Sequence, residues 1–542
     1  MARSQEIHSV DLLRDALANR GTAYSDAERD RLGLAGRLPP RVESIEEQVA
    51  RVVETVRAKS DSLERYSYLS AIQNENETLF FRAVRDNLHE FLPLIYTPTV
   101  GQACLEWSRL YVRPRGLYLT PEHRGKIADI LLRWPQRDVG IIVVTDGGRI
   151  LGLGDLGANG MGIPVGKLAL YTACAGVPPS RCLPVMLDVG TETKSIREDR
   201  FYLGRRVHRL AGEAYDAFVD EFLTAVQQVF PDAILQFEDF NNANAFGLLA
   251  RYRDRLCCFN DDVQGSGAMA LAGLYSSARL TNRKMTQERF LFVGAGEACL
   301  GIGAAIVAAL QRDGLNLEQA RSRCLFIDSK GTVVSARTDL AAHKRVFAQN
   351  LAPLPDLVAT IDAYHPTVLI GACGRAGVFT RPVLQAMTRS CNMPVVFALS
   401  NPTSKAECTA EQAYGWTDGR VIFAAGSPFD PVKIADGTRA PGQANNSYVF
   451  PGVGLGILVS GARRVTDAMF LAAAQALADQ VTEEDLQIGR IFPPQVRMRE
   501  VAIAVAAAVA QVAWDSGLAK TSAPKDPRTA VADAMYEPKY AN

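Results

Sequence analysis

The chain has 542 residues, of which 48% are hydrophobic and 22% are charged. This composition is typical of a globular protein with about three or four domains or subdomains and excludes a largely disordered chain. The 59 basic and 59 acidic residues cancel, so nucleic acid is not expected as the main partner. The N-terminus and the short apolar run 501–514 predict neither a secretory signal nor a membrane span. Ten scattered cysteines indicate reduced thiols in a cytoplasmic protein.

The first hundred or so residues are expected to be helical, with periodic stretches at 44–59 and 63–92. A buried strand at 139–144, a glycine-rich loop at 147–166 and a helix at 167–175 follow. From about residue 262, strands and helices alternate. The expected strands are 289–293, 324–327, 367–371, 395–399 and 421–424, and the first helix among them is 301–312. Such alternation predicts an α/β fold with a doubly wound parallel sheet.

A dinucleotide site is predicted where the apolar strand 290–293 runs into Gly294-Ala-Gly296-Glu-Ala-Cys299. Gly294 would make a tight turn, and Gly296 would let the backbone approach a pyrophosphate at a helix N-terminus. The third position of the pattern is Cys299 instead of glycine, so the motif alone is weak. The next strand ends at Asp328, roughly where an acid that binds ribose should fall. Beside it, Ser329, Lys330 and Lys344 fit either a 2′-phosphate or a solvated surface.

Two acidic segments carry a candidate metal site. Glu238 and Asp239 stand between bulky apolar residues, and Asp261 and Asp262 follow Asn260. Carboxylates in apolar surroundings are costly unless they are paired or bound to a metal, and oxygen ligands favour Mg²⁺ or Mn²⁺. The same pattern fits a helix cap at Asp261 or Asp262 and an exposed turn at Glu238 equally well.

Three further side chains are candidates for chemistry. Arg149 follows a strand and has the geometry to grip a carboxylate. Lys167 stands before an apolar helix, where partial burial would make it a usable base. Tyr96, in a turn, is a candidate acid. Each of the three also fits an ordinary solvated or packing role.

These segments together resemble the malic enzyme family. The resemblance rests on eight motifs that run in order along nearly the whole chain. They are the segments 96–101, 149–157, 160–168, 237–240, 259–265, 294–298, 400–403 and 445–452.

The resemblance implies oxidative decarboxylation of L-malate to pyruvate and CO₂, with reduction of NAD(P)⁺. It implies that Lys167 is the general base and Tyr96 the acid, with Asp261 in support. Arg149, Asn401 and Asn446 would bind the substrate, and Glu238, Asp239 and Asp262 would bind Mg²⁺ or Mn²⁺. The cofactor would be held by Gly294, Gly296, Glu297, Ala298, Asp328, Ser329, Lys330, Lys344 and Asn401.

The resemblance favours NADP over NAD, and it implies a cytoplasmic homodimer or homotetramer. Five segments are expected: a helical N-terminal domain at 1–113, a central domain carrying the metal and the base at 114–261, a Rossmann-type NAD(P) domain at 262–446, a return to the central domain at 447–520, and a tail at 521–542. One rival is a malolactic enzyme, which forms lactate with bound NAD. The other is a non-catalytic nucleotide-binding regulator. Such a protein would have lost at least one of five residues, all of which are present here: Tyr96, Lys167, Glu238, Asp239 and Asp262.

Overall fold

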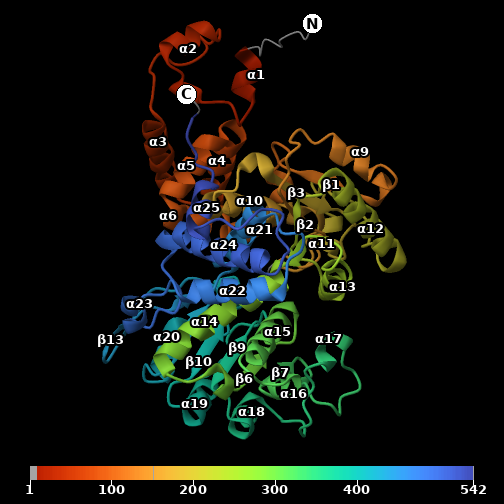
Figure 1. The fold of residues 1–542 in the computed structure, drawn as a ribbon, viewed down its shortest axis with the longest axis vertical. Coiled ribbons are helices and arrows are strands. Elements are labelled where there is room, and N and C mark those ends of the chain that lie inside the picture. Colours follow the sequence, from red (N-terminus) through yellow and green to blue (C-terminus); the bar gives the residue numbers. More distant parts are fainter. Residues whose placement is uncertain (1–8, 151, 541–542) are drawn as a thin grey trace. The chain divides into compact units, whose positions relative to one another are not determined.

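The computed structural model describes residues 9–150 and 152–540 (Figure 1). Its internal contacts divide the chain into two compact units. The first comprises 1–140, 156–230 and 534–542, and the second comprises 141–155 and 231–533. Leu151, in the expected glycine-rich loop and in one of the eight motifs, lies outside the described residues, as do positions 1–8 of the expected N-terminal domain and 541–542 of the tail. The expected domain boundaries remain a prediction.

The first unit begins with a series of helices, as expected. They are α1 (Ser9–Arg14), α2 (Asp26–Arg31), α3 (Ile45–Ala58), α4 (Ser62–Glu75), α5 (Glu77–Asp86), α6 (Leu88–Ile95), α7 (Thr99–Leu105) and α8 (Trp107–Leu110). The stretch 63–92 is helical as expected, and it is divided among α4, α5 and α6. Asn76 is extended, and its Oδ1 accepts the Leu79 N–H at 2.9 Å, so it caps α5 instead of continuing α4. Asn87 separates α5 from α6 in the same stretch.

The remaining elements of the first unit are β1 (Leu117–Leu119), α9 (Ile127–Leu132), α10 (Gly162–Ala175), β3 (Cys182–Leu187), α11 (Lys194–Arg197) and α12 (Gly212–Val229). β1 and β3 pair in parallel. The expected loop extends too far, because α10 already begins at Gly162. Glycine disfavours helices, but a Cβ on Gly162 would lie 2.7 Å from Cys104 Sγ, and one on Gly166 would lie 3.2 Å from Ile95 O. Close packing of α10 on α7 and α6 therefore outweighs the intrinsic preference.

The last described residues belong to the first unit. The Tyr536 N–H donates to the carbonyl of Gly176, at the end of α10, at 2.6 Å. The Tyr540 hydroxyl donates to Gln48 at 2.6 Å and accepts from Asn76 at 2.7 Å. These bonds fasten residues 534–540 to α3, α5 and α10.

The second unit contains three parallel strands, β2 (Ile141–Thr145), β4 (Ile234–Phe237) and β5 (Cys258–Asn260). All three are buried. The register pairs Phe237 with Asn260, so β4 and β5 end side by side. Helix α13 (Asn242–Tyr252) connects them, and a π-helical turn (Asp261–Gly265) leads from β5 into α14 (Ser266–Thr281).

The second unit also contains a seven-stranded sheet in the order β14-β11-β10-β9-β6-β7-β8. The strands are β6 (Phe290–Val293), β7 (Cys324–Asp328), β8 (Gly331–Thr332), β9 (Val368–Gly371), β10 (Val395–Ala398), β11 (Ile422–Ala425) and β14 (Gly442–Gln443). Only β8 runs antiparallel to its neighbour among these described strands. The order reverses between β6 and β9, which is the Rossmann arrangement, and ligands bind at that switch point. The predicted doubly wound sheet is therefore confirmed.

Helices cover both faces of this sheet. Leu291 and Leu325 belong to a core with residues of α18 (Leu357–Tyr364), α19 (Arg381–Ser390) and α20 (Ala410–Trp416). On the other face, Phe292 and Phe326 stack at 4.2 Å, and Gly303 of α15 (Glu297–Arg312) lies against Phe326. Two short helices, α16 (Leu317–Ser322) and α17 (Ala342–Arg345), and the hairpin β12 (Val432–Ile434) and β13 (Gly437–Arg439) lie between these elements in the chain.

The second unit ends in the helices α21 (Phe450–Ser460), α22 (Asp467–Ala478), α23 (Glu483–Gln487), α24 (Met498–Asp515) and α25 (Pro527–Asp533). The expected buried helix at 501–514 is α24, which packs against α21 and α22. Among the described residues, no helix is both long enough and apolar enough to cross a membrane.

Candidate active site

Three carboxylates converge where β4 and β5 end. Glu238 and Asp239 follow β4, Asp262 lies two residues beyond β5, and their ligand atoms all lie within 4.8 Å of one another. Glu238 and Asp239 are 2% and 5% exposed. The Asp239 backbone adopts a φ of +54°, and its N–H donates to Asp262 at 2.8 Å. Carboxylates held this close repel one another unless a cation joins them, so the donor set fits a hard divalent ion such as Mg²⁺ or Mn²⁺.

Asp261 and Asn446 hold the segment that carries Asp262. Asp261 is fully buried. The side-chain amide of Asn446 donates to the backbone carbonyl and to the carboxylate of Asp261, both at 3.2 Å. Because Asp261 precedes Asp262, this contact fixes the turn that presents Asp262. Asn446 therefore holds the turn in addition to its expected contact with substrate.

Arg149 links the acidic cluster to the dinucleotide loop. Its backbone N–H donates to the carbonyl of Asp239 at 3.0 Å, and its guanidinium lies 3.5 Å from the Glu297 carboxylate. Glu297 is 1% exposed. Burial raises the pKa of the Glu297 carboxyl to about 9, with further contributions from the charges of Asp262 and Asp239 and opposition from Arg149. Glu297 therefore holds its proton more firmly than an exposed glutamate does.

The predicted dinucleotide turn has the expected shape. Gly294 has a φ of +120°, and a Cβ on it would lie 3.1 Å from Ala372 O. Gly296 precedes α15, which begins with Glu297 and Ala298. The N-terminus of this helix therefore lies next to Gly294 and Gly296, where it can bind an anion. A Cβ on Gly296 would lie 3.3 Å from a guanidinium nitrogen of Arg149. Arg149 therefore lies against the turn that is expected to hold the pyrophosphate.

Asp328 ends β7 and is surrounded by cations. It accepts bonds from Arg337 at 2.8 and 3.2 Å, from Lys344 at 3.0 Å and from the Lys330 backbone at 2.9 Å. Partial burial would raise the pKa of Asp328, but these hydrogen bonds outweigh it and hold the pKa below its usual range. The Lys330 ammonium itself bonds to Asp339 at 2.9 Å. Ser329, the remaining predicted residue here, is exposed and follows Asp328 directly in the chain.

Sequence reasoning missed Arg337. Its guanidinium bonds both Asp328 and Asp339, which stand nine and two residues away. The signal available in the sequence was an arginine close to Asp328, the acid predicted to bind the ribose.

Asn401 follows β10, the strand next to β9 in the sheet. Its side-chain carbonyl accepts from the Ser427 hydroxyl at 2.8 Å, and a Cβ on Gly152 would lie 2.6 Å from the Asn401 backbone carbonyl. The loop is braced by Glu407, a fully buried residue that sequence reasoning also missed. Its carboxylate accepts the Ser400 N–H at 3.2 Å and the Cys373 N–H at 3.1 Å. One acid thus joins the loops that follow β9 and β10.

The first unit brings together the other two predicted residues. Tyr96 ends α6 and is 4% exposed, and Lys167 on α10 is 2% exposed. The Lys167 Nζ lies 5.4 Å from the centre of the Tyr96 ring. Gly166 permits this approach, because a Cβ there would lie 3.3 Å from the ring. A buried amine beside a buried phenol is an arrangement that can pass protons.

Comparison with known proteins identifies the family. Residues 73–253 match the malic enzyme N-terminal domain, and residues 263–514 match the malic enzyme NAD binding domain. The chain is 46% identical to an NADP-dependent malic enzyme of Anas platyrhynchos over 98% of this chain and 96% of that one. It is 47% identical to NADP-dependent malic enzyme 2 of Arabidopsis thaliana over 98% of this chain and 91% of that one.

The fold has counterparts among solved structures. The crystal structure of Entamoeba histolytica malic enzyme covers 93% of this chain and 90% of its own, with a TM-score of 0.59 and 21% identity. At that identity the likeness concerns the fold alone. The fold and the family models define a dinucleotide-binding enzyme. The chain belongs to the malic enzyme family.

Proposed function

We propose that this chain catalyses the divalent-metal-dependent oxidative decarboxylation of L-malate to pyruvate and CO₂, with NADP⁺ preferred to NAD⁺. The observation that carries the proposal is the carboxylate trio at the ends of β4 and β5, joined through Arg149 to the dinucleotide turn in one unit. Relatives named NADP-dependent malic enzymes, similar over nearly the whole chain, support the same reaction and cofactor.

In this proposal Glu238, Asp239 and Asp262 hold the cation, and Arg149, Asn401 and Asn446 bind malate. When bound, the cation would supply a Lewis acid next to the C2 oxygen, and the nicotinamide would supply the acceptor for the C2 hydride. Lys167 takes the proton of the C2 hydroxyl. After CO₂ leaves, Tyr96 gives a proton to C3. The contact between Lys167 and Tyr96 supports return of the first proton from the amine to the phenol, which closes the cycle without a net change in either residue.

The preference for NADP⁺ follows from the cations around Asp328. A lone acid at this strand end accepts the ribose 2′-hydroxyl of NAD and repels a 2′-phosphate. Here Arg337 and Lys344 bond Asp328, and Arg337 and Lys330 bond Asp339. Three cations thus face two acids, so the local charge is positive. Such a cluster suits the extra phosphate of NADP.

The test is an assay of the purified chain with L-malate and Mn²⁺, in parallel with NADP⁺ and NAD⁺. Reduced nicotinamide is followed by absorbance, and pyruvate is measured at the end. Faster reduction of NADP⁺ with equimolar pyruvate is expected. Faster reduction of NAD⁺ would keep the reaction and overturn the cofactor preference. Lactate without reduced cofactor would identify a malolactic enzyme, and no turnover would favour a non-catalytic regulator.

We also propose that the chain acts in the cytoplasm as a homodimer or homotetramer. Tyr111, Val112, Phe201 and Leu203 of the first unit are exposed by 41%, 86%, 47% and 62%, and exposed apolar side chains are common at subunit interfaces. Light scattering coupled to gel filtration tests this, because a monomeric mass would exclude both assemblies.

A further inference from the structure

Asp339, in the loop that follows β8, holds two of the three cations at the end of β7. Its Oδ2 accepts a bond from the Lys330 ammonium at 2.9 Å. The Arg337 guanidinium donates to both Asp339 oxygens, at 3.0 and 3.1 Å. The hydrogen bonds from Arg337 and then from Lys330 hold the pKa of the Asp339 carboxyl well below its usual range. Asp339 is therefore a fixed negative charge beside the cations that fit a 2′-phosphate.

Arg337 does not depend on Asp339 for its position. Asp328 accepts two bonds from the same guanidinium, at 2.8 and 3.2 Å. The guanidinium also donates to the carbonyls of Gly331 and Thr332, both at 3.4 Å. The Arg337 side chain is 14% exposed, so packing restrains it as well. Loss of the Asp339 charge is therefore expected to free N–H groups of Arg337 without displacing the residue.

The ion pair between Asp339 and Lys330 is open to exchange. The Lys330 side chain is 67% exposed, and that of Asp339 is 38% exposed. Exposed ion pairs of this kind contribute little to stability, because water solvates both partners when they separate. A phosphate group carries more charge than a carboxylate and offers three acceptor oxygens, which arginine binds in bidentate fashion. A phosphate that reaches Lys330 and Arg337 can therefore take the place of Asp339.

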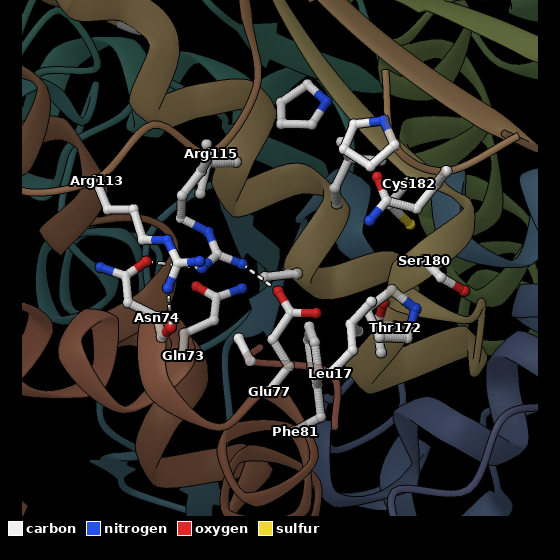
Figure 2. Close-up of a pocket in the computed structure, with 18 of the residues that line it drawn as sticks. Leu17, Gln73, Asn74, Glu77, Phe81, Arg113, Arg115, Thr172, Ser180 and Cys182 are labelled. Atoms are coloured by element: carbon white, nitrogen blue, oxygen red, sulfur yellow. Dashed lines mark hydrogen bonds and ion pairs between the residues drawn. The ribbon is translucent and has the colours of Figure 1, made fainter. Parts of the chain in front are cut away.

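A second charged cluster, in the first unit, has a different balance of charge. Arg113, Arg115, Asp15 and Glu77 line a cavity of about 370 Å³ among α4, α5 and α10 (Figure 2). Figure 2 shows Arg115 joined to Glu77 and to the Asn74 side chain. Two acids there offset two arginines, so no net charge is left to attract an anion. At the end of β7, in contrast, three cations face two acids, and an anion is attracted.

We propose that Asp339 determines how strongly this chain prefers NADP⁺ to NAD⁺, because it competes with the 2′-phosphate for Lys330 and Arg337. The inference rests on the proposed function, in which the cations at the end of β7 bind that phosphate. With Asp339 the cluster has a net charge of one positive, and Asp339→Asn makes the net charge two positive. The same substitution releases two cations from their carboxylate partner.

The competition concerns the 2′-phosphate alone. NAD⁺ has a neutral 2′-hydroxyl at that position, and the acid expected to accept it is Asp328. Asp328 has its own bonds from Arg337 and Lys344, which do not involve Asp339. Asp339 should therefore weaken the binding of NADP⁺ and leave that of NAD⁺ unchanged, which narrows the difference between the two cofactors.

The probes are adenosine 2′,5′-bisphosphate and 5′-AMP, which differ only in the 2′-phosphate, titrated into the full-length protein by calorimetry. The measured quantity is the ratio of their affinities, bisphosphate over 5′-AMP. Asp339→Asn should raise the affinity for the bisphosphate about tenfold, which is the order of effect of removing one repelling charge near a protein surface. The affinity for 5′-AMP should stay at the parental value.

Further variants separate competition from a structural role. Asp339→Glu keeps the charge and should keep the parental ratio. Lys330→Met in the Asp339→Asn background should remove part of the gain, since it deletes one of the released cations. Asp362→Asn is the matched control and should change neither affinity. Asp362 is also an exposed acid that bonds an arginine, Arg389, at 2.9 and 3.1 Å, outside this cluster.

An unchanged ratio in Asp339→Asn would overturn the proposal. A lower ratio would overturn it as well, because Asp339 would then position the cations for the phosphate instead of competing for them. Equal loss of affinity for both probes would show a structural role alone. The proposed preference for NADP⁺ is tested separately in the parent. Equal binding of the two probes there would contradict that preference, whereas a higher ratio in Asp339→Asn would still support the competition.

Discussion

The guanidinium of Arg337 grips both carboxylate oxygens of Asp328, at 2.8 and 3.2 Å. This contact determines what the end of β7 offers a cofactor. An acid held by a fork of two N–H bonds is oriented and neutralised, and Lys344 adds a second cation at 3.0 Å.

Replacing Lys344 by glutamine should therefore impair NADP⁺ use selectively. Loss of one charged hydrogen bond to a phosphate is worth about 1.5–3 kcal/mol, or a roughly tenfold to hundredfold rise in KM for NADP⁺. The KM for NAD⁺ should change little. Steady-state kinetics with both cofactors measure the effect, and Lys433→Gln, at an exposed lysine in β12, is the control. Equal losses with both cofactors would contradict a contact with the 2′-phosphate.

The acidic trio should bind metal even without substrate. Asp262→Asn removes one charged ligand, so the affinity for Mn²⁺ should fall, and the increase in Tm that Mn²⁺ confers should shrink. The metal-free variant should be as stable as the parent or more so, because less negative charge faces Glu238 and Asp239. Calorimetry and thermal unfolding with and without chelator measure both effects. Asp430→Asn, at an exposed acid, should leave them unchanged. An unaltered Mn²⁺ affinity for Asp262→Asn would exclude the trio as the metal site.

The Tyr96 and Lys167 pair should matter for rate and not for metal binding. Tyr96→Phe and Lys167→Met are each expected to lower kcat about 10²- to 10⁴-fold, which is the usual contribution of a positioned acid or base. Mn²⁺ affinity should stay at the parental value, since neither residue belongs to the trio. Tyr68→Phe controls for loss of a phenol in the same unit. A near-parental kcat for Lys167→Met would remove lysine from the mechanism.

The sheet was predictable because buried parallel strands are continuous apolar runs with clear ends. The expected strand 289–293 is β6, and 367–371 is β9, each within one residue at either end. Acids within two residues of the ends of such strands, such as Glu238 and Asp262, could be singled out for the same reason. Elements that depend on tertiary packing were not predictable. The start of α10 at Gly162 depends on contacts with α7, which lies more than fifty residues earlier in the chain.

The supporting residues escaped prediction for a related reason. Glu407 lies outside the motif 400–403, and its role appears only in the structure, where the loops after β9 and β10 both bond its carboxylate. In the sequence Arg337 is one of many arginines. It reaches Asp328 because β8 pairs antiparallel with β7 and so returns the chain toward that residue. Motifs identify the groups that do chemistry, whereas the residues that hold those groups are set by topology.

Close packing at Gly301 should link stability to the metal site. A Cβ on Gly301 would lie 2.3 Å from the backbone carbonyl of Val263, the residue after Asp262. Gly301→Ala should therefore cost about 1–3 kcal/mol of unfolding free energy and weaken Mn²⁺ binding by displacing the turn. Gly415→Ala is the matched control, because a Cβ there meets no atom within 4 Å and alanine favours helix α20. A parental Tm and metal affinity for Gly301→Ala would show that α15 shifts freely.

The pH dependence of Cys373 alkylation should report the electrostatics of the loop after β9. Burial, followed by the nearby charge of Glu407, raises the pKa of the Cys373 thiol to about 11. A raised thiol pKa means that the reactive thiolate is scarce at neutral pH and increases about tenfold with each pH unit up to that value. Alkylation of this partly exposed cysteine should therefore accelerate steadily from about pH 7 to pH 10, as peptide mass spectrometry would record, with Cys373→Ser as the unlabelled control. Glu407→Gln removes the second cause and should move the profile to lower pH. A rate that levels off below about pH 9 in the parent would show that the thiolate is stabilised in this loop instead of suppressed.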